Sequence, residues 1–333
     1  MILLKVAIVL ILANCLLACE PENSIPQAKS SHQYSERPLV AAALSSDASQ
    51  ALMLSIDGVL SLWDTHSRTL LRQWHQPAFD INENVYYAAL SANQQFVAVA
   101  GRTRVSVLSV NKGDTLVSWQ PKGFDTDATI TVLELGHSNE NVWLGMSDGS
   151  IITVDLLNNK QSMFAHHQGP VADIQISDNQ QKILSSSTDG SVVYWNAADG
   201  SVLNEREQNY RITSLAIDPA SQRVFLSDAL KSQLIWSLSE QNILSQLSYF
   251  GGARTFRESL FIDQGRKLIT ASSKQKITLW QVRSGEELGQ WQASAKSMAS
   301  TVFAMASARY GQVHTLTSDG VLEVWQIDRH IIE

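Results

Sequence analysis

A short segment with an Asp-Gly turn, alternating apolar residues and usually a closing tryptophan recurs along this chain. Its copies are DGVLSLWD at 57–64, DGSIITVD at 148–155, DGSVVYWN at 189–196, DGVLEVWQ at 319–326, and two looser ones, QLIWSL at 233–238 and KQKITLWQ at 274–281. An Asp-Gly turn that leads into an alternating strand is typical of a β-hairpin. The number and spacing of these hairpins therefore decide which architectures the chain can form.

The repeat has a regular period. Aligned on the end of the alternating strand, it is marked by Trp63, Leu108, Val154, Trp195, Trp236, Trp280 and Trp325. The intervals between these markers are 45, 46, 41, 41, 44 and 45 residues, and a second tryptophan follows three of them at a constant offset (Trp74, Trp119 and Trp291). An alternating segment also precedes each marker, shifted in the sixth unit, where it is SLFID at 259. Each unit thus predicts four short antiparallel strands.

A four-stranded sheet of this size cannot bury both of its faces alone, but it can when it packs radially against similar neighbours. The sequence therefore predicts an all-β fold, a single seven-bladed β-propeller of four-stranded antiparallel blades over residues 38–333. No helical periodicity competes over any length.

Over residues 38–328 the repeats resemble those of WD40 proteins. That family's blade signature is a His before the first strand, a Ser or Thr in the second, an Asp in the next turn and a Trp closing the third. The resemblance implies a hydrogen-bonded structural tetrad in the fourth unit, made of His167, Ser185, Asp189 and Trp195. Units two and three lack the Trp, so apolar stacking must hold those blades.

Closure of the ring has two candidate solutions. Only eight residues follow Trp325, too few for a last strand in the register of the other units. Part of residues 26–36 can supply that strand from the N-terminal side, as often happens in the family. The alternative is a short C-terminal strand from 330–332.

The N-terminal segment is predicted to be a targeting signal. One early charge, Lys5, precedes an apolar run over 6–12 that is too short to cross a bilayer comfortably and ends in small residues, as signal peptides do. Leu-Leu-Ala before Cys19 resembles a bacterial lipobox. This predicts a signal peptide over 1–18, and a lipidated Cys19 with a polar tether over 19–37, part of which can close the ring. An uncleaved anchor and a plain secretory signal are the alternatives.

The lipoprotein resemblance also implies a location. In Gram-negative bacteria, lipoproteins whose lipidated cysteine is followed by Asp are retained in the inner membrane. In this chain the residue after Cys19 is Glu20. We therefore expect an outer-membrane protein that faces the periplasm, held by the acyl chains at Cys19.

Composition and scattered histidines argue against catalysis. The net charge is −7 without a basic cluster, so no nucleic-acid partner is expected. The only cysteines are Cys15 and Cys19. His166 and His167 could share a metal, but the resemblance gives His167 a structural role. The Asp-Gly pairs are explained by turn chemistry, and no channel-side cluster of acids is evident. We expect no metal, no cofactor and no enzymatic activity.

The loops that join one unit to the next are the candidate binding surface for an unidentified protein partner. Aromatic rings with arginines are typical of interface hot spots. The candidates are Phe79, Phe124, Tyr210, Arg211, Tyr249, Phe250, Arg254, Phe256 and Arg257. The alternative is that these rings anchor the loops by packing between blades. The predicted function is a non-catalytic scaffold of the cell envelope. The alternatives are an accessory lipoprotein of an outer-membrane assembly complex and, less favoured, a small-ligand or hydrolase-type propeller.

Overall fold

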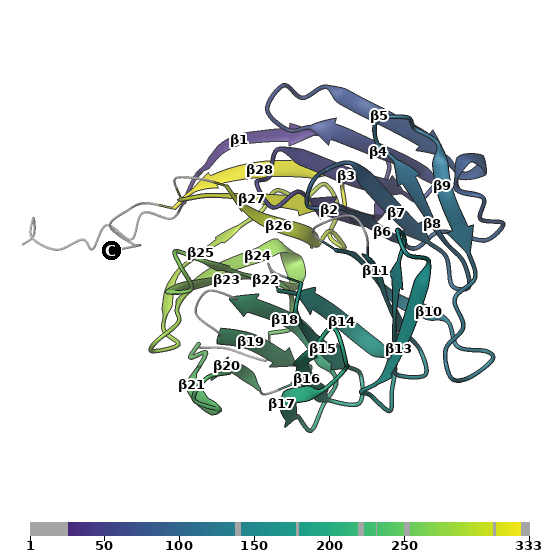
Figure 1. Ribbon diagram of the computed structural model, residues 1–333. Helices are drawn as coiled ribbons and strands as arrows, with labels where there is room; N and C mark the ends of the chain where they lie inside the picture. Colours follow the sequence, from purple (N-terminus) through teal and green to yellow (C-terminus); the bar gives the residue numbers. More distant parts are fainter. Residues whose placement is uncertain are drawn as a thin grey trace, which may run out of the picture.

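Seven antiparallel sheets of four strands each surround a central axis (Figure 1). The computed structural model describes residues 26–136, 141–177, 180–218, 223–230, 232–249, 254–308 and 311–327. The innermost strands contact one another in cyclic order, and the last of them, in the seventh blade, contacts the first. The predicted seven-bladed propeller is therefore confirmed. The predicted signal peptide, Cys19 and residues 330–332 lie outside the described residues.

Within each blade the strands are named a to d from the channel outward. The a strands are β2 (Leu39–Leu44), β6 (Tyr87–Leu90), β10 (Ile130–Leu135), β14 (Val171–Ile176), β18 (Ile212–Asp218), β22 (Phe256–Ile262) and β26 (Val302–Ala308). The b strands are β3 (Gln50–Ser55), β7 (Phe96–Ala100), β11 (Asn141–Met146), β15 (Lys182–Ser187), β19 (Arg223–Asp228), β23 (Lys267–Ser272) and β27 (Gln312–Thr317).

The c strands are β4 (Val59–Asp64), β8 (Val105–Ser109), β12 (Ser150–Asp155), β16 (Ser191–Asn196), β20 (Gln233–Ser237), β24 (Lys276–Gln281) and β28 (Val321–Gln326). The d strands are β5 (Leu70–His75), β9 (Thr115–Trp119), β13 (Lys160–Ala165), β17 (Val202–Glu207), β21 (Asn242–Gln246), β25 (Glu287–Gln292) and β1 (Ala28–Gln33). Two short 3-10 helices, η1 (Gln76–Phe79) and η2 (Ser273–Gln275), lie in connections. The sixth a strand, β22, begins three residues earlier than the SLFID segment suggested.

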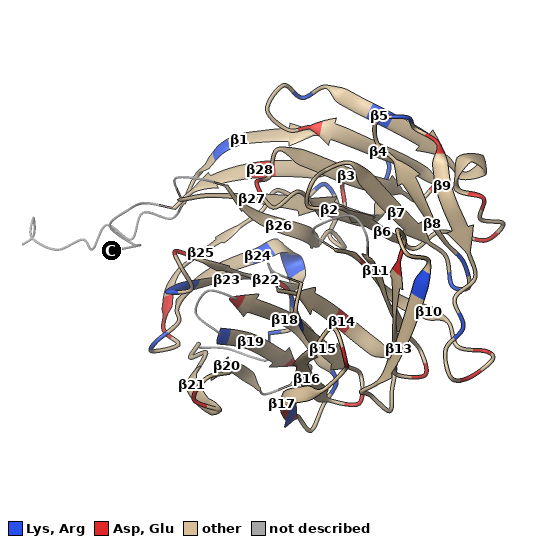
Figure 2. Cartoon of the chain, viewed as in Figure 1, with Lys and Arg blue, Asp and Glu red and all other residues tan. Residues whose placement is uncertain are grey.

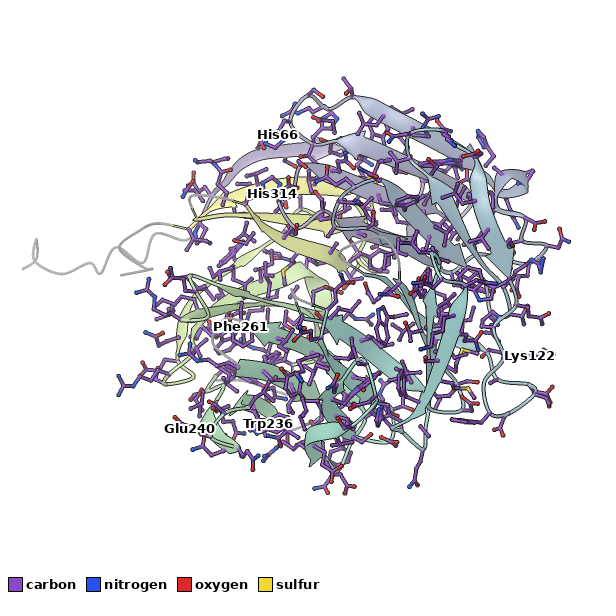
Figure 3. All side chains as sticks on the ribbon, in the orientation of Figure 1. His66, Lys122, Trp236, Glu240, Phe261 and His314 are labelled. Carbon is purple, nitrogen blue, oxygen red and sulfur yellow. The ribbon has the colours of Figure 1, made fainter. Side chains whose placement is uncertain are left out.

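The core lies between blades at the b strands, where almost every residue is buried, and at the c strands, which range from fully to partly buried. The d strands are mostly exposed. The tryptophans at the second fixed offset join neighbours. Trp74 of the first blade shares a buried cluster with Val97 and Leu108 of the second, and its Nε1 donates to the carbonyl of Gly113 at 3.0 Å. Side chains fill these spaces, while Lys122 and Glu240 lie on loops that project outward (Figure 3).

The ring is closed by the N-terminal strand. β1 runs antiparallel to β28, with Ala28 opposite Trp325 and Gln33 opposite Val321, and the two lie side by side in Figure 1. Tyr34, which follows β1, is 9% exposed and packs edge-on against Trp63 of the first blade at 5.3 Å. Of the two closures considered, the structure contains the N-terminal one. Within the segment 19–37, residues 28–33 are thus the part that closes the ring.

Among the described residues, neither 3-10 helix has the length and apolar character needed to cross a membrane. Acidic and basic positions are interspersed along the visible blades and loops (Figure 2).

Candidate functional site

The tetrad expected in the fourth blade is assembled. The Nε2 atom of His167, on the loop before β14, lies 2.8 Å from the Ser185 hydroxyl in β15, and Trp195 Nε1 donates to the same hydroxyl at 3.1 Å. Asp189, in the b–c turn, accepts from the backbone N–H groups of Gln168 and Gly169 at 2.8 and 3.1 Å. The tetrad thus ties the d–a loop to the b–c turn on one face of the blade, which we call the loop face.

In this tetrad the histidine is neutral and the aspartate is ionised near pH 7. Burial lowers the pKa of His167 to about 4, so the imidazole is neutral near pH 7. Burial would raise the pKa of Asp189, but hydrogen bonds from Ser191 and from the Gln168 backbone outweigh it and lower the pKa to about 2. His166 does not join His167 at a metal, because its ring packs on Trp195 at 4.5 Å and stacks on Phe164.

Four of the predicted rim residues are loop anchors. Phe79 and Phe256 are fully buried in inter-blade clusters. Tyr249 packs edge-on against Trp280, and the Arg254 guanidinium covers the Tyr249 ring at 4.5 Å while it pairs with Glu287 at 2.9 Å. Phe79 therefore anchors a loop between the first and second blades, and the other three pack at the fifth and sixth blades. The prediction of an exposed interface was wrong for Phe79 and Phe256, which are fully buried. Phe250 lies outside the described residues.

Phe124 and Tyr210 are exposed on the loop face, at 56% and 42%, and Arg211 is exposed beside Tyr210. Their loops lie on either side of the loop that carries His167. Both loops are held by neighbouring turns: the Asp148 carboxylate accepts from the N–H of Asp125 at 2.9 Å, and the N–H of Gln208 donates to the Gly190 carbonyl at 2.9 Å. The rings are thus presented from fixed backbone.

Gly190 explains the close approach at the second loop. Its φ is +96°, and a Cβ atom there would lie 2.2 Å from the Gln208 carbonyl oxygen. Only glycine fits, because the left-handed backbone and the clash both exclude a side chain.

An exposed aromatic on the loop face was missed by the sequence reasoning. Tyr86, just before β6, is 39% exposed, and the Arg102 guanidinium of the adjoining b–c turn lies 5.8 Å from its ring centre. Tyr86 belongs to VYYAALS at 85–91, one of the alternating segments that precede the markers, and such a segment predicts a strand. A pairing of an exposed ring with an arginine one turn away is visible only once the blade is folded.

The central channel contains acids that sequence reasoning also missed. Glu134 of β10, Asp173 of β14 and Glu258 of β22 line one cavity together with Arg257. Arg257 lies in strand β22 and lines this cavity, whereas the sequence placed it in the loop before the strand. The expectation that no acids cluster at the channel was therefore wrong. Each acid occupies an interior position of an a strand, which marks it as a channel candidate, but only the closed ring shows that the three lie together.

Burial raises the pKa of all three acids, and their mutual repulsion adds to the shift for two. The pKa of Glu134 rises to about 8, with a contribution from Asp173, and that of Asp173 rises to about 6. The pKa of Glu258 rises well above its ordinary value through burial and through repulsion by Asp173 and Glu134. Within the described part of the chain, no three acidic, His or Cys side chains are placed to hold a metal ion.

Comparisons with known proteins agree with this geometry. The WD40 family model, described as "WD domain, G-beta repeat", matches residues 158–196, which run from the end of the third blade through strand c of the fourth. The chain is 26% identical over 119 residues to a guanine nucleotide-binding protein subunit beta of Saccharomyces cerevisiae, covering 35% of this chain and 28% of that protein.

Two relatives from Schizosaccharomyces pombe match longer segments. The chain is 20% identical over 232 residues to the target of rapamycin complex subunit wat1, covering 67% of this chain and 71% of that protein. It is 21% identical over 241 residues to the WD repeat-containing protein slp1, covering 70% of this chain and 47% of that protein.

Fold and site together define the class: a seven-bladed β-propeller with a structural hydrogen-bond tetrad and a loop face that carries exposed rings. Within that class, the chain contains a WD40 repeat, the one whose tetrad is complete.

Proposed function

We propose that this chain is a non-catalytic binding propeller that presents the loop face to a protein partner. The observation that carries the proposal is the set of exposed rings Tyr86, Phe124 and Tyr210, accompanied by Arg102 and Arg211 on loops of fixed geometry. Tyr and Arg are enriched at binding hot spots, and rigid presentation lowers the entropy lost on association. Two relatives are named as subunits, of a guanine nucleotide-binding protein and of the target of rapamycin complex.

The proposal includes a lipid anchor in the bacterial envelope, supported by the apolar N-terminal run and the Leu-Leu-Ala-Cys motif that ends at Cys19. The outer membrane, facing the periplasm, is the proposed location because Glu20 follows the cysteine. A role as accessory lipoprotein of an outer-membrane assembly complex is proposed by analogy alone, from the fold and the proposed location.

Closure by β1 determines from which face of the propeller the N-terminal chain enters. Ala28 lies opposite the end of β28, where the other blades have their c–d turns, and Tyr34 reaches the loop face, where its N–H donates to the Gly320 carbonyl at 2.9 Å. The chain therefore enters from the face opposite the loop face. A lipid at Cys19 would leave the loop face turned away from the bilayer and open to partners.

The test is crosslinking and affinity capture of the full-length protein from envelopes. Tyr210→Ala with Arg211→Ala, and Phe124→Ala separately, should lose the proteins captured by the wild type while the melting temperature stays unchanged. The matched control is Leu203→Ala, because Leu203 is 41% exposed on the outer strand β17, away from the loop face. If capture survives both loop-face changes, or is lost equally in the Leu203→Ala control, the proposed surface is wrong.

A further inference from the structure

The central cavity has about 630 Å³ of space and is lined by a strands from all seven blades. This volume lies within the range of small-molecule sites. Its ionisable lining groups are Glu134, Asp173, Glu258, Arg257 and Tyr87. The three carboxyls come from the third, fourth and sixth blades, so only the closed ring brings them together.

The net charge of this lining is −2 when its three carboxyls are ionised. Three carboxylates, when ionised, face one guanidinium, and the Tyr87 phenol is neutral because burial raises its pKa. Neither Glu134 nor Glu258 takes a hydrogen bond or an ion pair from the described residues, and their pKa shifts come from burial and like charge alone. Asp173 accepts one side-chain donor, Gln175 Nε2, at 3.1 Å.

Hydroxyl groups without partners lie in the same wall. The Ser186 side chain is completely buried, and its Oγ has no hydrogen-bond partner among the described residues. Ser186 is the cross-strand partner of Asp173, so the two side chains share one face of the blade, and both line the cavity. Thr131 Oγ1, beside the cavity on β10, also lacks a partner. Buried polar atoms without partners are rare in folded proteins and call for an explanation.

We propose that the central channel binds a small organic dication, a linear diamine or polyamine, through Glu134, Asp173 and Glu258. Its two ammonium groups would neutralise the net charge of the lining, and their N–H groups would donate to the carboxylates. The Ser186 and Thr131 hydroxyls add acceptors at the wall. The described carboxyls are not placed to share one metal ion, and separated carboxyls suit charges that are themselves separated along an alkyl chain.

Binding of such a ligand should release protons. In the free protein the raised pKa values of Glu134 (about 8) and Asp173 (about 6) keep these groups partly protonated at neutral pH. A bound cation favours the ionised forms. Affinity should therefore increase as the pH rises from about 6 to about 8.

The test is titration calorimetry of the full-length protein with putrescine and spermidine at low ionic strength, with n-butylamine as the monocation. We expect putrescine to bind, n-butylamine to bind about ten-fold or more weakly, and the heat to depend on the buffer's ionisation enthalpy because protons are released. Glu134→Gln and Glu258→Gln should each weaken putrescine binding about ten-fold. Glu207→Gln, an exposed acid on β17, is the matched control and should bind as the wild type does.

Proton release by the wild type needs no variant, so the test remains decisive if a channel variant fails to fold. The absence of putrescine and spermidine binding at millimolar concentration would overturn the proposal. So would equal affinity in both channel variants, binding of Mg²⁺ that displaces putrescine from the wild type, or capture of a lysine-rich peptide without binding of the free amines. The loop-face proposal is independent of every one of these outcomes.

Discussion

At the scale of single residues, two groups of polar side chains show opposite designs. The fourth-blade tetrad satisfies its members: His167 is kept neutral by burial and bonded on both nitrogens, to Ser185 at 2.8 Å and to Ser191 at 2.6 Å. The channel acids are the reverse, because burial and like charge act on Glu134 and Glu258 without a compensating hydrogen bond. A satisfied network stabilises a fold, whereas unpaired buried carboxyls destabilise it.

This contrast predicts that one substitution, Glu134→Gln, raises the stability of the protein at alkaline pH but not at acidic pH. The pKa of Glu134 is about 8 in the folded protein and near its ordinary value when unfolded. Stability linked to this group is fully present below about pH 4.5, and it is lost as the pH rises through about 8. Glu134→Gln removes that loss, so the variant should melt at a higher temperature than the wild type at alkaline pH and at a similar temperature near pH 4.5.

The measurement is the melting temperature of both proteins across this pH range, with Glu207→Gln as the control that should follow the wild type throughout. A difference between Glu134→Gln and the wild type that is constant with pH would contradict the raised pKa.

The tetrad could be predicted from the sequence and the channel acids could not, for a physical reason. His167, Ser185, Asp189 and Trp195 lie within one repeat, so their spacing alone specifies their contacts. Glu134 and Glu258 are 124 residues apart, and each alone reads as an ordinary polar position in an alternating strand. Their proximity depends on the radius of the ring, which no local pattern encodes.

At the scale of elements, β1 is the strand on which the closed ring depends. Without it, the β28 edge would expose unpaired N–H and C=O groups, and Tyr34 would leave its contact with Trp63. The sequence placed this strand within residues 26–36 because too few residues follow Trp325. Loop anchoring was harder to foresee, since Phe79 and Phe124 have similar polar surroundings in the sequence, but only Phe79 is buried.

Loss of the closing strand should therefore be costly. Deletion of residues 26–34 is expected to lower the melting temperature by about 5–10 °C or more and to promote aggregation through the open β28 edge. Tyr34→Ala should produce part of the loss, of order 3 kcal/mol, because it empties a buried aromatic site. Lys29→Ala, on the exposed side of the same strand, should leave stability nearly unchanged. Scanning calorimetry of the three variants makes the comparison, and a deletion variant that melts like the wild type would exclude the closure.

At the scale of the whole molecule, the repeat period was sufficient to predict the fold, because each four-stranded sheet is stable only between neighbours and seven of them close a ring. Which face lies toward the N-terminal segment and which is left open was not predictable, since this depends on the face from which the chain enters the propeller. β1 rises from the c–d side to the loop face, and nine residues of extended chain span at most about 30 Å between Cys19 and Ala28. A propeller anchored at Cys19 would therefore stay within about 30 Å of the bilayer, and we expect its c–d turns to face the lipid.

This orientation can be measured by energy transfer to an acceptor-labelled lipid, using lipidated full-length protein in vesicles. Cys15 and Cys19 are the only cysteines, so removal of the signal and acylation of Cys19 would leave no other thiol to label. Ala198→Cys places a donor dye in an exposed c–d turn, and Lys122→Cys places it in an exposed loop on the opposite face. The two faces are separated by a six-residue strand, about 20 Å, so transfer should be clearly more efficient from position 198. Equal transfer from both sites, or stronger transfer from position 122, would show that the loop face is not turned outward.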